Sequence, residues 1–314
     1  MLKVIAFFLL SFWAAMTPIN MAQAGETVFE DHFAGVERLM QDGSKKRYPD
    51  RTKWAFTFWP GTVWPDSYGD GTNWLAGNTE CQTYVTPWLE WIKGSHVPAN
   101  LRYDPFTITQ EGLSIKADVL TPAQRAAYKT EADYRMFGSG LLLSRTSFKY
   151  GKIRVVAKLP SARGSWPAIW LLASARQWPP EIDILEGMAW GPHKNEIHSG
   201  MLARSEDKNK GFGKWFDVGV DPSQGFHEYG LDWNKDTMAM TFDGKTLWTK
   251  KTPESMNQEM YLIINLAVGG KWPYNEVGIK PTDDESPERL KRGSDMIAPD
   301  YPAAMIIKSV SVTR

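Results

Sequence analysis

The chain has 314 residues, with 36 basic and 36 acidic side chains and a single cysteine, and this balance excludes several classes of protein. A protein that binds a phosphate backbone needs a basic face, so zero net charge predicts no nucleic-acid partner. One cysteine permits neither an intramolecular disulfide nor a metal site built from several thiolates, and Cys81 is expected to be a small buried side chain. The short run Lys45-Lys46-Arg47 is expected to be a solvated loop.

The first 24 residues have the pattern of a secretory signal peptide. Lys3 precedes an apolar run at residues 4–15, and Ala22-Gln23-Ala24 places small residues at the cleavage positions. The apolar run is too short to cross a bilayer, and Pro18 interrupts the segment after it. We therefore expect cleavage after Ala24, a secreted or periplasmic protein, and no membrane association once the signal has been removed.

Most of the remaining chain is predicted to form β-strands, because alternating or β-branched runs are bounded by Gly, Pro, Asn and Asp. The clearest strands are expected at 28–29, 112–117, 140–144, 152–159, 168–172, 181–186, 198–203, 227–233, 237–242, 260–268 and 305–312. Residues 35–100 and 275–301 show little regularity. The lack of alternating strands and helices argues against a Rossmann fold or a TIM barrel. We expect one all-β domain over residues 27–314.

One segment has the pattern of a helix. Thr121 is a good N-cap residue, and Pro122 occupies the first helical position, where its missing N–H is not needed. An irregular loop over 121–128 is an equally good interpretation.

The chemically informative stretch is Glu181-Ile-Asp183-Ile-Leu-Glu186. Side chains alternate faces along a strand, so Glu181 and Asp183 share one face, and Glu186 is out of phase with them. A β-bulge near Ile184-Leu185 would restore the phase and place three carboxylates in one row. Three acids on one face repel one another, so such a strand is expected where a reaction uses them.

The acidic strand has two other interpretations. A merely solvated strand is disfavoured by the neighbouring Trp166, Trp170, Trp178 and Trp190, which suggest a lined cleft. A calcium site would take its ligands from flexible polar loops, whereas the intervening residues here are Ile, Ile and Leu. The two-histidine helix of a metalloprotease and the Gly-x-Ser-x-Gly motif of a serine hydrolase are both absent from the sequence.

Five segments in order resemble glycoside hydrolase family 16, the laminarinase-like β-glucanases, and together they span nearly the whole chain after residue 27. The acidic stretch resembles that family's E-x-D-x-x-E signature in its bulged form. The other segments are 78–82 (NTECQ), 164–170 (GSWPAIW), 226–233 (FHEYGLDW) and 265–273 (NLAVGGKWP). The connection at 99–138 looks more like that of exopolysaccharide-depolymerising relatives.

The resemblance implies a concanavalin A-like β-jelly-roll sandwich with a concave substrate cleft. It implies that Glu181 is the nucleophile, Asp183 its helper and Glu186 the general acid/base of a retaining glycosidase. The substrate-binding residues that we expect are Trp166, Trp170, His198, Trp272, Asn265 and Glu80. His198 is as readily interpreted as a half-buried, hydrogen-bonded histidine. Ordinary packing is the better interpretation of any one of the N-terminal tryptophans: Trp54, Trp59, Trp64, Trp74, Trp88 and Trp91.

The implied function is a secreted endo-acting β-glycanase that hydrolyses β-1,3- or mixed-linked glucans by double displacement. A depolymerase, processing enzyme or transglycosylase for the producer's own exopolysaccharide is the alternative, and a non-catalytic carbohydrate-binding sandwich is a more distant one. We expect a monomer whose partner is a polysaccharide, and no cofactor. Many bacterial members bind a structural calcium through an acid in the last strand, but Lys308 and Ser309 stand near that position, so no metal is assigned.

Overall fold

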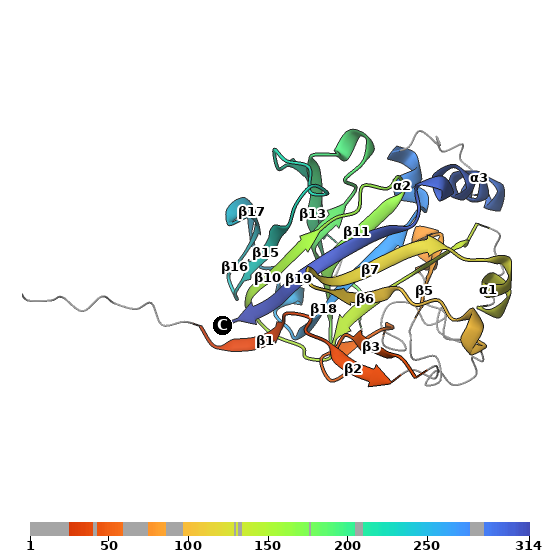
Figure 1. Ribbon diagram of the computed structural model, residues 1–314. Helices are drawn as coiled ribbons and strands as arrows, with labels where there is room; N and C mark the ends of the chain where they lie inside the picture. The colour runs from red at the N-terminus through yellow and green to blue at the C-terminus, as the bar shows by residue number, and fades with distance from the viewer. Residues whose placement is uncertain are drawn as a thin grey trace, which may run out of the picture.

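The computed structural model describes residues 25–39, 43–58, 75–85, 97–128, 130, 134–175, 177–204, 210–276 and 286–314 (Figure 1). Within this part, strands form a sheet of ten, a sheet of seven and a small separate hairpin. Every strand pair is antiparallel except β5 with β8. The predicted signal peptide lies outside the described residues.

The larger sheet has two strands attached beside its main order. That order is β17 (Lys245–Lys251), β16 (Thr237–Phe242), β15 (His227–Trp233), β10 (Gly151–Lys158), β19 (Ala303–Thr313), β7 (Gly112–Val119), β8 (Phe137–Ser139) and β5 (Gln82–Tyr84). The attached strands are β1 (Thr27–Asp31), which pairs with β19, and β6 (Phe106–Thr109), which pairs with β7.

The smaller sheet carries the acidic strand near its middle. Its order is β14 (Lys210–Asp217), β13 (Glu196–Ala203), β12 (Glu181–Gly187), β11 (Ser165–Ala173), β18 (Met260–Val268), β9 (Leu141–Ser144) and β4 (Trp54–Ala55). The hairpin consists of β2 (Val36–Leu39) and β3 (Lys45–Tyr48).

Short helices join the strands. The α-helices of the described part are α1 (Pro122–Ala127), α2 (Lys271–Glu276) and α3 (Pro287–Ile297). Single 3₁₀ turns lie at Ala76–Asn78, Ala99–Leu101, Gly191–His193, Glu254–Met256 and Ala298–Asp300. Figure 1 shows α2 beside α3 at one end of the sheets.

The main core lies between the two sheets, because each contributes one apolar face. Val155 of β10 and Ile307 of β19 meet Ile169 and Leu171 of β11 in this cluster, and all four are fully buried. On β11 the alternate residues, including Trp170, belong to a second apolar cluster on the other face of the smaller sheet. This arrangement is the predicted jelly-roll sandwich, and it leaves that second face available to form a cleft.

The structure confirms most of the predicted strands. It also confirms the helix at 122–127, where Thr121 and Gln124 form a reciprocal capping box. The turn Asp243-Gly244 joins β16 to β17 with positive φ at both residues, as a two-residue type I′ hairpin requires. Cys81 is fully buried, as expected.

Two sequence-based expectations were wrong. The basic run at 45–47 is not a loop but strand β3, because it pairs with β2 and Lys46 forms an ion pair with Asp104. Helices α2 and α3 lie in segments for which no helix was predicted.

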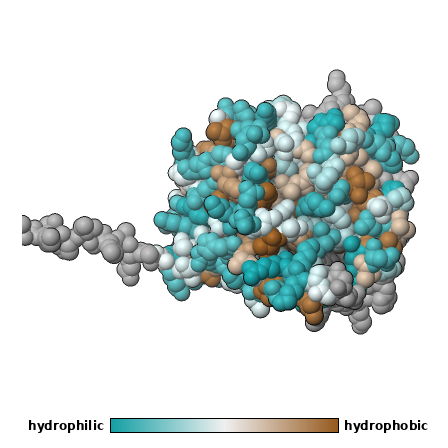
Figure 2. Space-filling model, viewed as in Figure 1, coloured by the Kyte–Doolittle hydropathy of each residue, from teal (hydrophilic) through white to brown (hydrophobic). Residues whose placement is uncertain are grey.

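The surface over the larger sheet carries mainly hydrophilic side chains, with apolar ones in small separate patches (Figure 2). Charged pairs lie on this side of the molecule: Arg154 of β10 contacts both Glu228 and Asp232 of β15. Of the helices that the structure describes, none has the length and apolar character needed to cross a bilayer.

Candidate active site

A β-bulge in β12 places the three carboxylates on one face. Asp183 pairs with Trp170 of β11, whereas Glu186 pairs with Ala168, so Ile184 and Leu185 together occupy the space of one residue. The pairing with β13 shifts at the same point. Both bulged side chains are buried in the main core. The bulge predicted from the sequence is therefore present, and the acids lie on the face away from that core.

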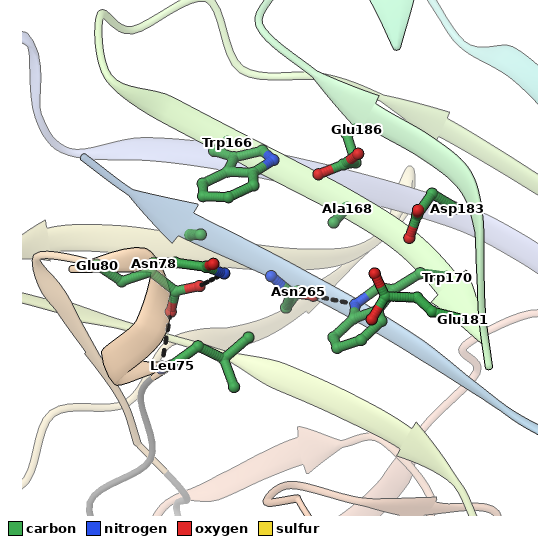
Figure 3. Close-up of a pocket in the computed structure, with 11 residues that line it drawn as sticks. Leu75, Asn78, Glu80, Trp166, Ala168, Trp170, Glu181, Asp183, Glu186 and Asn265 are labelled. Atoms are coloured by element: carbon green, nitrogen blue, oxygen red, sulfur yellow. Dashed lines mark hydrogen bonds between the residues drawn. The ribbon is translucent and has the colours of Figure 1, made fainter. Parts of the chain in front are cut away.

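The three acids line a hollow of about 390 Å³ on the smaller sheet. Figure 3 shows Glu181, Asp183 and Glu186 along one side of it and Asn78, Glu80 and Leu75 on the opposite side. Its remaining lining residues are Trp166, Ala168, Trp170, Asn265 and Ala267, which come from the neighbouring strands β11 and β18.

Burial alters the acidity of two of these carboxyls. The pKa of Glu181 is raised to about 7, mainly by burial; the charge of Glu186 adds to this rise, and a hydrogen bond from the indole Nε1–H of Trp178 at 3.0 Å opposes it. Burial also raises the pKa of Asp183 well above its usual value, and the charges of Glu181 and Glu186 add to this. Both carboxyls therefore keep a proton to a higher pH than an exposed carboxyl does.

Glu186 has a different partner. Its Oε2 lies 2.8 Å from Nδ1 of His198, the residue directly opposite on β13. Both side chains are about one-fifth exposed, so the pair faces the open part of the site. Both interpretations of His198 are therefore correct, because it is a hydrogen-bonded, partly buried histidine and it also lines a hollow beside the acids.

Aromatic rings extend the site beyond the acids. A second hollow, of about 800 Å³, shares Glu181, Glu186, Asn78 and Trp166 with the first and adds His198, Gly213, Lys214, Trp215 and Trp272. Trp272 of α2 packs edge-on against Trp166 at 5.2 Å between ring centroids and lies 5.3 Å from Trp215 of β14. Together these rings form one aromatic wall.

Trp215 was not predicted as a site residue. It belongs to none of the segments that carry the family resemblance, and strand β14 itself was not predicted. The sequence did contain a signal for a strand here, because the aromatic residues Phe212, Trp215 and Phe216 lie within five residues.

Hydrogen bonds fix the floor of the first hollow. Trp170 donates from Nε1 to Asn265 Oδ1 at 2.7 Å (Figure 3). Asn265 donates from Nδ2 to the Tyr84 hydroxyl at 2.8 Å. Tyr84 in turn hydrogen-bonds Glu80, which is only 2% exposed. This series of hydrogen bonds connects β11, β18 and β5, so it fixes the orientation of the polar groups in the floor of the hollow.

Glu80 accepts further hydrogen bonds from its own segment. Its carboxylate accepts from the Leu75 N–H and Asn78 Nδ2, both at 3.2 Å, and from Gln82 Nε2 at 2.6 Å. Burial nevertheless raises its pKa to about 7. Glu80 thus lines the hollow and accepts hydrogen bonds from Leu75 and Asn78, which line the same side of it.

All nine predicted site residues line the two hollows: Glu80, Trp166, Trp170, Glu181, Asp183, Glu186, His198, Asn265 and Trp272. Trp54, by contrast, is a fully buried core residue that donates to Asp31. The other five N-terminal tryptophans, Trp59, Trp64, Trp74, Trp88 and Trp91, lie outside the described residues.

The residues near β1 and the end of β19 do not fit a calcium site. The carboxylate of Asp31 accepts from the Phe33 N–H and from Trp54 Nε1, both at 2.8 Å. Lys308 places a cation nearby on β19, over the ring of Phe226. Over the described part of the chain, no cluster of three or more His, Cys, Asp or Glu side chains could hold a metal ion.

Comparison with known proteins gives consistent matches. The sequence profile of glycosyl hydrolases family 16 matches residues 103–282. The endo-1,3-1,4-beta-glycanase EglC of Rhizobium meliloti is 32% identical over 205 residues, which is 62% of this chain and 39% of that protein. The endo-1,3-1,4-beta-glycanase ExsH of the same organism is 32% identical over 222 residues, covering 69% of this chain and 42% of that protein.

A solved structure covers the chain more completely. The non-specific endo-beta-1,3(4)-glucanase SCLam aligns with 95% of this chain and 94% of its own, with a TM-score of 0.65 and 25% identity. EglC and ExsH are longer proteins, and the matched region is about two-fifths of their length.

Proposed function

Because the chain belongs to glycosyl hydrolases family 16, we propose that it is a retaining endo-β-glycanase that hydrolyses β-1,3- or mixed-linked β-1,3/1,4-glucans. One observation carries the proposal: Glu181, Asp183 and Glu186 lie in one row beside a wall of tryptophan rings. The activities for which EglC, ExsH and SCLam are named support the same substrate class.

Glu181 is the proposed nucleophile. A carboxylate that attacks the anomeric carbon must be ionised, and the indole N–H of Trp178 favours that charged form because it can only donate. Burial and the charges of Glu181 and Glu186 raise the pKa of Asp183 well above its usual value, so Asp183 can hold a proton beside an ionised Glu181. Its role is to keep Glu181 charged and not to react.

Glu186 is the proposed general acid and base. In the first step it protonates the glycosidic oxygen while Glu181 bonds to the sugar and the leaving chain departs. In the second step the resulting Glu186 carboxylate takes a proton from water, which displaces Glu181 from the anomeric carbon. Two inversions give overall retention.

The tryptophans supply binding. Sugar rings present apolar C–H faces, on which indole rings stack, and polar neighbours such as Asn78 bond the hydroxyl groups. A wall that includes Trp166, Trp215 and Trp272 beside the acids suits an internal segment of a long chain. We therefore propose endo action.

The stereochemistry of azide rescue tests the two roles. If Glu181 is the nucleophile, Glu181→Ala should let azide attack an activated β-glycoside directly and give the α-glycosyl azide. Glu186→Ala should still form the glycosyl-enzyme, and azide should then displace Glu181 and give the β-azide. Each variant should lose several orders of magnitude on natural glucan. The β-azide from the Glu181 variant would overturn the assignment.

Export is a further part of the proposal, and it rests on the sequence alone. The apolar run and the small residues at Ala22 and Ala24 support cleavage before Gly25. N-terminal sequencing of exported protein should start at Gly25, and an exported chain that retained Lys3 would contradict it.

A further inference from the structure

The contact between His198 and Glu186 is a product of the β-bulge. The bulge brings Glu186 onto the same face as Glu181 and directly opposite His198 in the β12–β13 ladder. If the same six residues formed a regular strand with no bulge, Glu186 would point into the core, and His198 would face no carboxylate at this position. The same local irregularity therefore supplies both the acid and its partner.

The imidazole ring is held on several sides. Trp215 and Trp272 pack edge-on against it, with centroids 5.5 Å and 5.1 Å away. Gly213 of β14 leaves room for the ring, since a Cβ at that position would lie 2.8 Å from His198 Cε1 and 2.9 Å from Nε2. The ring is thus confined to an orientation in which Nδ1 faces Glu186.

The two outer carboxylates have partners of different chemistry. Trp178 can only donate, so it favours the charged state of Glu181. A nitrogen of a neutral imidazole can instead donate or accept, depending on the tautomer, so it can bond either a carboxylate or a carboxylic acid. Such a partner suits a group that must gain and lose a proton in each cycle.

We propose that His198 is a positioning residue for Glu186, an inference that rests on the proposed function. Its Nδ1–H donates to Oε2, so the transferable proton of Glu186 is held on Oε1. Among the described residues Oε1 has no hydrogen-bond partner, which leaves it for the glycosidic oxygen. Glu186 gives that proton to the leaving oxygen and regains one from water, and His198 keeps its own proton throughout.

Two matched variants test the position of the donor. Asn places its amide nitrogen at the same distance from the backbone as Nδ1, whereas Gln places it where Nε2 lies. His198→Asn should therefore retain most of the activity on β-glucan oligosaccharides. His198→Gln and His198→Ala should lose on the order of 10² in kcat/KM, the lower range of acid catalysis.

The choice of substrate separates positioning from a merely structural effect. A dinitrophenyl β-glycoside has a leaving group that needs no proton, and kcat/KM reports only the steps up to formation of the glycosyl-enzyme. The Gln and Ala variants should thus lose only a few-fold on this substrate. Gly213→Ala, which pushes the ring without removing it, should show the same dependence on the leaving group.

His193→Asn is the matched control. His193 stacks on Trp215 of the aromatic wall, with ring centroids 3.6 Å apart, but it hydrogen-bonds Glu196 and not Glu186. Its exchange should cost the same factor on both substrates. Equal losses on both substrates for His198→Ala, or equal activity of the Asn and Gln variants, would overturn the role of His198. A wild-type protein that cleaves neither substrate would overturn the proposed function itself.

Discussion

The exchange Glu80→Gln probes a buried carboxyl group that lines the same hollow as the proposed catalytic acids. Glu80 is 2% exposed, and its pKa rises from an ordinary value of 4.5 to about 7 because burial outweighs four hydrogen-bond donors. A carboxyl with a raised pKa holds more protons in the folded than in the unfolded protein. The free energy of unfolding therefore falls as pH rises from about 4.5 to about 7.

The size of the effect follows from this difference. The rise of 7 − 4.5 = 2.5 in pKa, at about 1.4 kcal/mol per pH unit, corresponds to about 3 kcal/mol. The side chain introduced by Glu80→Gln would carry no charge, but its NH₂ group would face one of the donors, such as Asn78 Nδ2. An unmatched donor of this kind costs about 1–3 kcal/mol at any pH.

The measurement is urea unfolding of both proteins between pH 5 and pH 8, with Glu111→Gln as an exposed control. At pH 5 the Glu80→Gln variant should be less stable than the wild type. By pH 8 the difference in free energy of unfolding should shrink by up to about 3 kcal/mol, because the buried Glu80 ionises in the wild type and the glutamine of the variant does not. Titration of Glu181 and Asp183 occurs in both proteins and cancels in the difference. A deficit that grows with pH would refute the reasoning, since it would mean that the donors outweigh burial.

Three further predictions concern catalysis and metal dependence. Asp183→Asn should reduce kcat/KM on β-glucan less than Glu181→Ala or Glu186→Ala does, because Asp183 tunes a neighbour and forms no bond to substrate; parallel assays of the three variants check the ranking, which an equal loss would contradict. Calcium should not raise the melting temperature by several degrees over chelator, because the Asp31 carboxylate already accepts two hydrogen bonds and Lys308 places a cation nearby, and calorimetry in both buffers decides it. Solution viscosity of a β-glucan should fall before reducing ends accumulate, whereas early release of only mono- or disaccharide would exclude endo action.

The sequence predicted the site better than the fold's periphery. The position of the bulge followed from the alternation of side chains along a strand. Glu181 and Glu186 are five positions apart, so they can share a face only if one residue between them is accommodated in a bulge. The helix α1 followed from Thr121 and Pro122, which supply its cap and its first turn. Both are local signals, and local signals can be read from one chain.

Other elements were missed for reasons that are equally local. Helix α3 begins with Ser286 as N-cap and a proline, the same signature as α1. The helix has few apolar positions, however, and it contains Gly293, which lowers helix propensity. A glycine is needed there because a Cβ would clash with the ring of Tyr274. Tertiary packing, which the sequence pattern does not show, overrides the weak propensity of such a segment.

Strand β14 was hidden by residues that serve the site. Its two glycines lower β-propensity, yet Gly213 is required because the His198 ring occupies the space of a side chain. Trp215, two residues along the same strand, completes the aromatic wall. Gly213 therefore weakens the sequence signal of the strand and also makes room for the His198 ring.

The partners of the acids could not be ranked from the sequence either. Trp178 precedes Glu181 by three residues and reaches it after two prolines, whereas His198 follows Glu186 by twelve residues on the next strand. Nothing in the spacing indicates that one carboxylate receives a pure donor and the other an imidazole. The two partners nevertheless differ in chemistry, because an indole nitrogen can only donate, whereas an imidazole nitrogen can donate or accept, depending on the tautomer. The opposite roles that we propose for Glu181 and Glu186 therefore depend on neighbours that only the folded strands bring beside them.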